Sequence, residues 1–214
     1  DEADIESLKS FFDSEEYQKF NTQSDYHIDE AISMLNNSKR AVVLIGGGVR
    51  ISNAQHELLE FLKKYNLPVV YSLMGKDAIS EEYQYNMGLI GSYGNRYGNL
   101  TLANSDLILV LGSRLDTRQT GTNLETFARE AKIIQVDIDQ HELGSKIKVD
   151  LQICSDVKEF LEKINTQSLK IDTKGWLEQL NIYKSRFSSI IGIDNNEKIP
   201  NLVVSKIAKF LKDE

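Results

Sequence analysis

Two arginines stand on either side of an aspartate in the segment Gly112–Gly121, which follows a run of apolar residues. A guanidinium group matches the oxygens of a phosphate with two parallel hydrogen bonds, and Asp116 could hold an arginine in position for this contact. The alternative is a surface cluster of ion pairs, which adds about 0–1 kcal/mol of stability and binds nothing. The predicted phosphate-binding residues are Gly112, Ser113, Arg114, Asp116 and Arg118.

Three consecutive glycines, Gly46, Gly47 and Gly48, separate another apolar run from a segment with helical periodicity. Glycines let the backbone approach a ligand, and the first N–H groups of a following helix can bind an anion. The dinucleotide fingerprint requires a glycine where Ile51 stands and an acid at the end of the next strand, where none occurs before Asp77. NAD is therefore disfavoured, and a tight turn that binds nothing is an equal alternative.

Two further segments carry candidate binding groups. Asp137, Ile138 and Asp139 follow an apolar run, and a carboxylate there can accept hydrogen bonds from ribose hydroxyls or an adenine amine; turn formation is an equal alternative. The glycine-rich loop Gly88–Gly94 could lie against a flat ring or be an ordinary loop. The histidines are scattered and Cys154 is the single cysteine, so neither a metal site nor a catalytic nucleophile is predicted.

Apolar runs alternate with helical patterns, which predicts an α/β fold with a doubly wound, Rossmann-like parallel sheet and helices on both faces. Because crossovers are right-handed, the carboxyl ends of the strands, and any ligand, meet on one rim. Capping-box spacing predicts helix starts at Ser52–Gln55 and at Thr122–Glu125, the latter helix reaching Ala131. Asp156 is predicted to cap the helix Val157–Ile164. The predicted strands are residues 41–45, 68–72, 106–111, 132–136 and 151–154, with a loop between the second and third.

The two ends of the chain differ from this pattern. Apolar residues within 28–35 predict a short helix after a polar, acidic stretch. Near the other end, a stripe at helical spacing and a helix starting at Pro200 are interpreted as surfaces for other domains or for self-association, joined by a polar linker over 193–199. The stripe comprises Trp176, Leu180, Tyr183 and Phe187, and the last helix carries Val203, Ile207 and Phe210.

Composition excludes several classes of protein. The 214 residues carry a net charge of −7 and no basic stripe, which argues against nucleic acid and anionic membranes as partners. No apolar run approaches the roughly 20 residues of a membrane span. The single cysteine excludes an internal disulfide and fits a reducing, cytoplasmic compartment. The acidic start without Met suggests a piece of a longer chain.

Taken in order, the motifs closely resemble the central domain of thiamine diphosphate-dependent enzymes of the acetolactate synthase type. The resemblance covers residues 28–165, with a linker at 1–27 and, at 166–214, a second linker and the first helix of a carboxy-terminal domain. The ordered set makes the match specific. Its pieces are Ile45–Gly48, Pro68–Ser72 with Gly75-Lys76, Met87–Gly94, Ala103–Asp106, Leu109–Gly121 and Ile133–Asp139.

The resemblance implies a fragment of a three-domain enzyme. In the family, the amino-terminal domain supplies the glutamate that activates the thiazolium, and the carboxy-terminal domain supplies a Gly-Asp-Gly motif for magnesium and diphosphate. This chain contains no Gly-Asp-Gly, so it is expected to be inactive alone. The implied parent is a cytoplasmic homo-oligomer, dimer or tetramer, that acts on 2-keto acids in branched-chain amino-acid biosynthesis. Acyl transfer to a keto-sugar in polysaccharide synthesis is the alternative.

The resemblance also implies a cofactor, because the central domain of flavin-containing relatives binds extended FAD. By this resemblance, the dinucleotide would be lined by Gly46, Gly47 and Gly48, and the flavin end would contact Ser72, Leu73, Ile90, Gly91, Ser92 and Tyr93. The phosphates and sugars would be held by Gly112, Ser113, Arg114, Asp116 and Arg118. The adenosine end would contact Asp137, Ile138 and Asp156. The chain has Gly91-Ser92-Tyr93-Gly94 for the usual Gly-Met-His-Gly, and Arg114-Leu115-Asp116-Thr117-Arg118 for Arg-Phe-Asp-Asp-Arg. The residues expected at the flavin end thus differ more from the family's usual sequence than the residues expected at the phosphate end.

Three functional hypotheses remain open. The first is an FAD- or ADP-binding central domain, and the second is a structural spacer with an empty cleft. The third is an NAD-dependent, sirtuin-like enzyme of related fold, against which the single cysteine and the weak fingerprint count.

Overall fold

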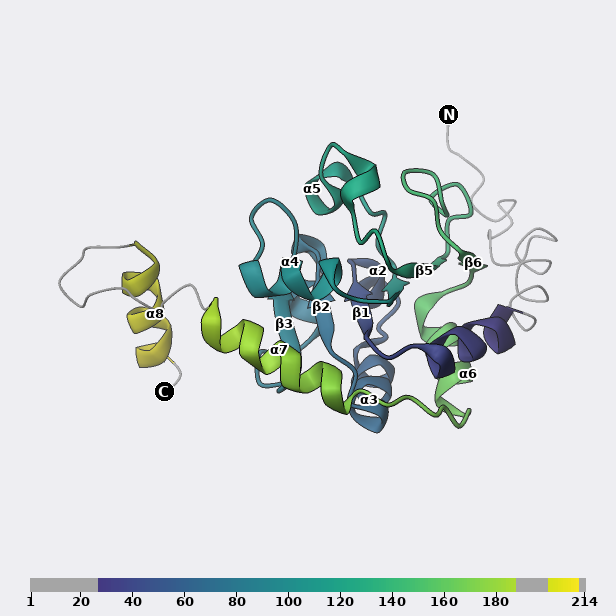
Figure 1. Ribbon diagram of the computed structural model, residues 1–214, viewed down its shortest axis with the longest axis horizontal. Coiled ribbons are helices and arrows are strands. Elements are labelled where there is room, and N and C mark those ends of the chain that lie inside the picture. The colour runs from purple at the N-terminus through teal and green to yellow at the C-terminus, as the bar shows by residue number, and fades with distance from the viewer. Residues whose placement is uncertain (1–26, 188–199, 212–214) are drawn as a thin grey trace, which may run out of the picture.

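The computed structural model describes residues 27–187 and 200–211, apart from some side chains of the last segment. Six parallel strands form one sheet in the order β3-β2-β1-β4-β5-β6 (Figure 1). Chain order runs outward in both directions from the central pair β1 and β4, so the topological switch point lies between their carboxyl ends. The strands are β1 (Ala41–Ile45), β2 (Val69–Tyr71), β3 (Asn86–Leu89), β4 (Leu107–Leu111), β5 (Lys132–Asp137) and β6 (Leu151–Cys154).

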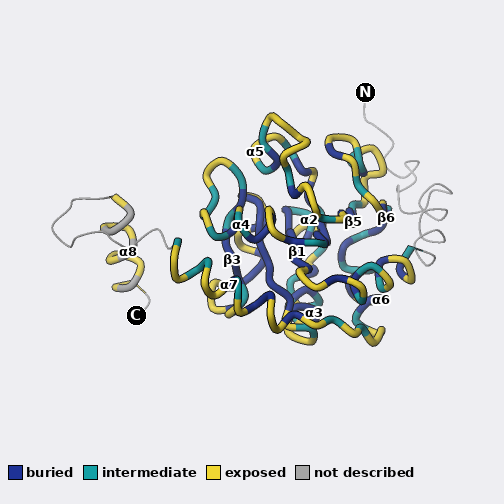
Figure 2. Tube along the Cα trace, viewed as in Figure 1, coloured by how far each residue is buried: buried dark blue, intermediate teal, exposed yellow. Residues whose placement is uncertain are grey.

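Both faces of the sheet are covered, which is why its central strands are apolar throughout. Every residue of β1 and β4 is buried, and the dark blue of β1 is visible in Figure 2. Val43 and Ile45 face one core, whereas Val42 and Leu44 face the other. The first core is covered by a helix over residues 27–37, α3 (Gln55–Tyr65) and α6 (Val157–Asn165). The second is covered by α4 (Arg96–Ala103) and α7 (Lys174–Arg186).

The predicted fold class and the five predicted strands are confirmed, but the predicted loop between the second and third contains β3 and α4. Both predicted capping boxes are wrong. The Ser52 hydroxyl donates to the carbonyl of Gly48 within the short helix α2 (Gly48–Ile51), and α3 begins after Ala54 without a side-chain cap. The predicted helix reaching Ala131 is absent from this described segment, which holds only the 3₁₀ turn η4 (Leu124–Thr126).

The apolar stripe near the end of the chain belongs to this fold. Trp176 and Leu180 are 4% and 2% exposed and pack on the second core beside Leu102 of α4. The expectation that these residues await another domain is therefore wrong. The final helix, α8 (Pro200–Leu211), begins at Pro200 as predicted, and its apolar side chains Val203, Ile207 and Phe210 are exposed. The predicted linker over 193–199 lies outside the described residues.

Candidate functional site

The carboxyl ends of β1 and β4 touch through their glycines. The N–H of Gly46 donates to Leu111 O at 2.9 Å, and the N–H of Gly48 donates to Gly112 O at 3.0 Å. A Cβ on Gly46 would lie 2.1 Å from Gly112 O, and one on Gly48 would lie 2.6 Å from the Cα of Gly112. Gly112 itself has φ +56°, which favours glycine. These glycines are thus required by the contact between the two strand ends, with or without a ligand.

This contact changes the role expected of the first glycine turn. The helix that follows it, α2, has only four residues. The N–H of Gly48 at its start is already bonded to Gly112 O. A dinucleotide fold ordinarily presents the N-terminus of a full helix to the pyrophosphate. Here α2 does not supply that feature, so an anion at the rim would have to contact the neighbouring loop instead.

The loop after β4 contains both candidate arginines. Asp116 caps the short helix α5 (Thr117–Thr120), because its Oδ1 accepts the backbone N–H of Arg118 at 2.9 Å. The prediction that Asp116 holds an arginine side chain in position is therefore wrong. The guanidinium of Arg118 is exposed and has no partner among the described residues. Leu115, buried with φ +52°, turns the backbone between the two arginines.

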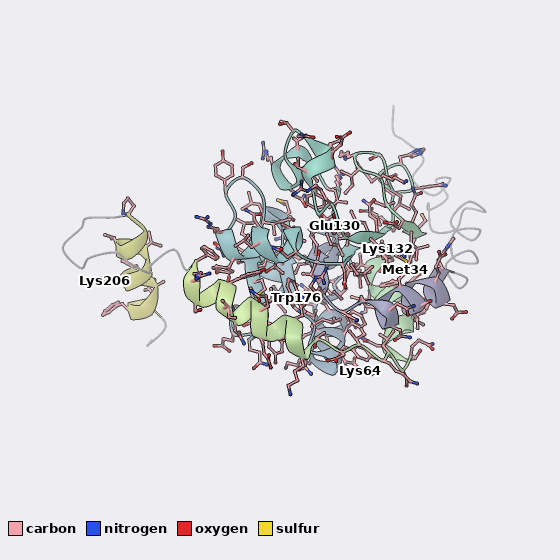
Figure 3. All side chains as sticks on the ribbon, in the orientation of Figure 1. Met34, Lys64, Glu130, Lys132, Trp176 and Lys206 are labelled. Atoms are coloured by element: carbon pink, nitrogen blue, oxygen red, sulfur yellow. The ribbon has the colours of Figure 1, made fainter. Side chains whose placement is uncertain are left out.

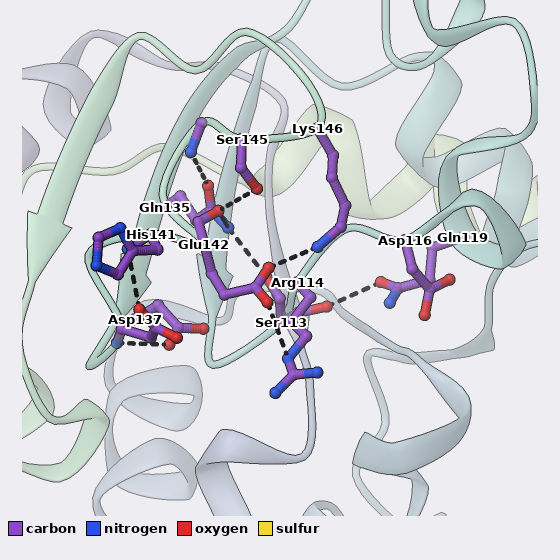
Figure 4. Close-up of polar contacts among 12 residues, drawn as sticks. Ser113, Arg114, Asp116, Gln119, Gln135, Asp137, His141, Glu142, Ser145 and Lys146 are labelled. Atoms are coloured by element: carbon purple, nitrogen blue, oxygen red, sulfur yellow. Dashed lines mark hydrogen bonds and ion pairs between the residues drawn. The ribbon is translucent and has the colours of Figure 1, made fainter.

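Arg114 is held from the next loop. Its Nε lies 3.4 Å from the Glu142 carboxylate, whose other oxygen lies 2.5 Å from Lys146 Nζ (Figure 4). The Arg114 side chain remains 72% exposed. A pair this exposed contributes little to stability, so the guanidinium is available to another anion. The structure therefore places Arg114 and Arg118 on one loop at the rim, with only Arg114 engaged.

A buried glutamine, Gln135, which is not among the residues predicted from the sequence, joins these two loops. The Nε2 of Gln135 donates to Ser113 O at 3.1 Å and to Glu142 O at 3.3 Å, while its Oε1 accepts the Gly144 N–H at 2.9 Å (Figure 4). Gln135 is 1% exposed. The signal was present: a lone amide inside the apolar strand β5 needs partners. Its contacts fix the segment carrying Arg114.

At the end of β5, Asp137 accepts the N–H of Asp139 at 3.0 Å, and Asp139 accepts the N–H of His141 at 2.9 Å. Burial raises the pKa of Asp137, and the nearby carboxylates of Glu142 and Asp139 raise it further. Ile138 beside it is 42% exposed. A hydrogen-bond donor or a cation at the rim would therefore stabilise the charged form of this half-buried carboxyl group.

The opposite side of the rim comes from the segments after β2 and β3. Ser72 is 4% exposed and its N–H donates to Ile45 O at 2.9 Å. Leu73 and Tyr93 are 65% and 88% exposed. Ile90 is 4% exposed and packs in the second core, so its side chain does not face the rim as expected.

Gly91 joins this side of the rim to the arginine loop. A Cβ on Gly91 would lie 2.1 Å from Arg118 O, and the Ser92 N–H donates to the same oxygen at 3.1 Å. Asn99 holds Gly91 from the other side, donating to its carbonyl at 3.0 Å and accepting its N–H at 2.8 Å. The segments expected at the flavin and phosphate ends are thus in direct contact.

Asp156 acts as a helix cap, as predicted. Its Oδ1 accepts the N–H groups of Lys158 at 2.7 Å and Glu159 at 3.4 Å, at the start of α6. No group of three or more His, Cys, Asp or Glu residues gathers as a metal site within 27–187 and 200–211. In the same ranges, no helix is long and apolar enough to cross a bilayer.

Comparison with known proteins identifies the family of this chain. The family model described as the thiamine pyrophosphate enzyme central domain matches residues 28–164. A probable acetolactate synthase large subunit from Methanococcus aeolicus is 33% identical over 198 residues, covering 87% of this chain and 33% of that protein. The acetolactate synthase large subunits of Cyanidium caldarium and Corynebacterium glutamicum are 32% and 34% identical, covering 97% and 80% of this chain and 36% and 28% of their own lengths. The chain thus spans about a third of these relatives.

Proposed function

This chain belongs to the thiamine pyrophosphate enzyme family as a central domain of the acetolactate synthase type, and we propose that its rim binds an FAD- or ADP-like nucleotide. The observation that carries the proposal is the loop with Arg114 and Arg118, which presents two exposed guanidinium groups at the carboxyl end of a central strand. Charge-assisted hydrogen bonds of this kind are the strong ones in phosphate binding.

The rest of the rim suits the other parts of such a ligand. Asp137 offers a half-buried carboxyl to a ribose or adenine donor. Leu73 and Tyr93 present exposed apolar surface on the side where a flavin ring would lie. An FAD bound here would supply an extended, planar, redox-active ring, and the chain's own residues would only bind and orient it. We also propose that the parent enzyme, of which this chain is one domain, converts 2-keto acids with thiamine diphosphate and magnesium.

Titration calorimetry of the 214-residue chain with FAD and with ADP tests the nucleotide proposal. Arg118→Gln should weaken binding by about 10-fold, because loss of about 1.4 kcal/mol is tenfold in affinity. The matched control is Arg129→Gln, which removes an exposed arginine just before β5, at the opposite edge of the sheet. Similar affinities for ADP and FAD would show that the flavin end contributes little. Absence of binding at millimolar concentrations, or equal affinity of the two variants, would instead favour the spacer hypothesis.

We also propose that the 214-residue chain alone is catalytically silent. The support is its lack of a Gly-Asp-Gly motif. In the parent, this domain would work beside the other domains of a cytoplasmic homo-oligomer and make no bond-breaking contact itself. The test is incubation with pyruvate, thiamine diphosphate and magnesium, and any carbon dioxide or acetolactate above the blank would contradict the proposal.

A further inference from the structure

A buried amide interrupts the apolar residues of β5. Gln135 is 1% exposed, and its neighbours in the strand, Ile134 and Val136, are buried in the first core. Burying an amide costs free energy unless its polar groups are hydrogen-bonded, whereas an apolar side chain would fill the same space without that requirement. The packing of the sheet alone therefore does not account for a glutamine at this position.

The hydrogen bonds of this amide end on the backbone of the two loops at the rim (Figure 4). Its Nε2 donates to Ser113 O at 3.1 Å, in the loop after β4, and to Glu142 O at 3.3 Å, in the loop after β5. Its Oε1 accepts the N–H of Gly144 at 2.9 Å, also after β5. Because each bond holds a backbone group, Gln135 sets the distance between the two loops and not merely the position of one side chain.

The two loops carry the groups of the proposed nucleotide site. Ser113 directly precedes Arg114 in the sequence. Its hydroxyl donates at 2.8 Å to Oε1 of Gln119, which follows Arg118 in α5. Glu142, whose backbone carbonyl the amide binds, also places its carboxylate 3.4 Å from Arg114 Nε. One buried side chain thus positions both partners of this ion pair.

The same strand also carries the carboxyl group expected at the adenosine end. Gln135 and Asp137 are two positions apart in β5, so their side chains lie on the same face of the sheet. Burial raises the pKa of Asp137, while the nearby positive charge of Arg114 lowers it. One nucleotide can meet this guanidinium and this carboxyl together only if the Arg114 loop keeps its distance from β5.

We propose that Gln135 is a positioning residue for nucleotide binding, which holds the loop of Arg114 where the guanidinium can meet a phosphate while Asp137 meets the ribose. This inference rests on the proposed function of the rim. With 1% of its surface exposed, Gln135 has almost no area for a ligand to contact. It acts by restricting motion that the loops would otherwise lose on binding, and such pre-organisation strengthens binding without a new contact.

A double-mutant cycle in the 214-residue chain tests this role by calorimetry with ADP. Gln135→Met keeps the length of the side chain and removes its hydrogen bonds, so it should weaken ADP binding about fivefold. In an Arg114→Gln background, the same substitution should change the affinity by less than about twofold, because the group through which Gln135 acts is already absent. A merely structural role would weaken binding by the same factor in both backgrounds, and that result would overturn the proposal.

Ser105→Ala is the matched control, because it removes a buried hydrogen bond at the opposite end of the sheet. The hydroxyl of Ser105, which is 0% exposed, donates to Leu102 O at 2.8 Å. Ser105 lies two residues before Leu107, which pairs with Lys132 where β4 and β5 begin (Lys132 is labelled in Figure 3). Ser105→Ala should bind ADP as the parent does, and a loss as large as that of Gln135→Met would refute the positioning role.

The same measurements separate this inference from the proposed function. If Arg114→Gln weakens ADP binding and Gln135→Met does not, the positioning role is wrong and the nucleotide proposal stands. If the parent binds no ADP at millimolar concentration, both are wrong. Gln135→Glu keeps the acceptor but has no donor when ionised, so it should behave as Gln135→Met does and replaces that variant in the cycle if it does not fold. Circular dichroism confirms the fold of each protein.

Discussion

The contact between the ends of β1 and β4 makes Gly46→Ala a sharp test of the fold. The added Cβ would lie 2.1 Å from Gly112 O and 2.6 Å from Ser113 Cβ, whereas real Cβ atoms do not approach heavy atoms closer than 3.0 Å. The obstacle at Gly112 is backbone and cannot rotate away. The strand ends must therefore separate, and the Gly48 N–H to Gly112 O hydrogen bond is strained or lost.

The expected cost follows from these contacts. Overpacking of a well-packed site costs about 1–3 kcal/mol, and a lost hydrogen bond adds about 0.5–1.5 kcal/mol. We expect Gly46→Ala to lower the free energy of unfolding by about 2–4 kcal/mol. Urea unfolding followed by the fluorescence of Trp176, the single buried tryptophan, measures this directly.

Two other glycines are matched controls for the same substitution. A Cβ on Gly175, in the first turn of α7, meets no atom within 4 Å, so Gly175→Ala should be neutral or stabilise by up to about 1 kcal/mol. Gly121 also has open space, but its φ of +80° and ψ of 176° lie in a region that is open almost only to glycine, so Gly121→Ala should cost about 1–3 kcal/mol in backbone strain alone. If Gly46→Ala unfolds at the same urea concentration as the parent, the reasoning about the strand ends is refuted.

Two carboxyl groups give further predictions. Asp156→Ala should destabilise the chain by about 1 kcal/mol, because the start of α6 loses its cap; urea midpoints should show Asp156→Asn losing less, and equal losses would contradict the capping role. Burial raises the pKa of Asp137, so the folded state holds the proton more tightly and this group's contribution to stability falls as pH rises above about 4. Asp137→Asn should abolish that fall in unfolding free energies measured across the pH range, and a parent whose stability rises more steeply than the variant's would refute the sign.

The central strands could be predicted because burial on both faces leaves a continuous apolar run. Ala41–Ile45 matches β1 without error, and β4 and β5 differ from their predicted bounds by one residue. The parallel sheet and its single rim followed from the alternation of these runs with helices. Asp156 was also predictable, since a cap followed by an apolar helical pattern is a local signal.

The errors came from elements whose stability is not local. β3 reads Asn-Met-Gly-Leu, without β-branched residues, and among the described strands it pairs only with β2, at the edge of the sheet. Its Met87 is buried in the core that α4 and α7 cover. The helix predicted from the capping-box spacing at Thr122 does not form, because that spacing is a local signal and does not provide a surface on which a helix can pack. Trp176 was assigned to another domain because its partners, such as Leu102, lie more than seventy positions away in sequence.

At the site, the sequence predicted which segments meet but not what their groups do there. The carboxylate of Asp116 binds a backbone N–H and not a guanidinium. Ile90 was expected to face a ligand but is buried in the second core. Gln135 was overlooked although it organises two loops. These roles depend on backbone dihedral angles and on distances between loops, which residue spacing does not encode.

The contacts at the rim favour one direction for the proposed nucleotide to lie in. Because Gly48 N–H is bonded to Gly112 O, the phosphates are better served by the loop of Arg114 and Arg118 than by the crevice between β1 and β4. Arg114 would have to exchange Glu142 for a phosphate, and it can do so at low cost because Lys146 remains with Glu142 at 2.5 Å. Arg118 has no pair to give up among the residues that the structure describes. The two guanidinium groups therefore favour a ligand extended along the rim, from Asp137 past both arginines.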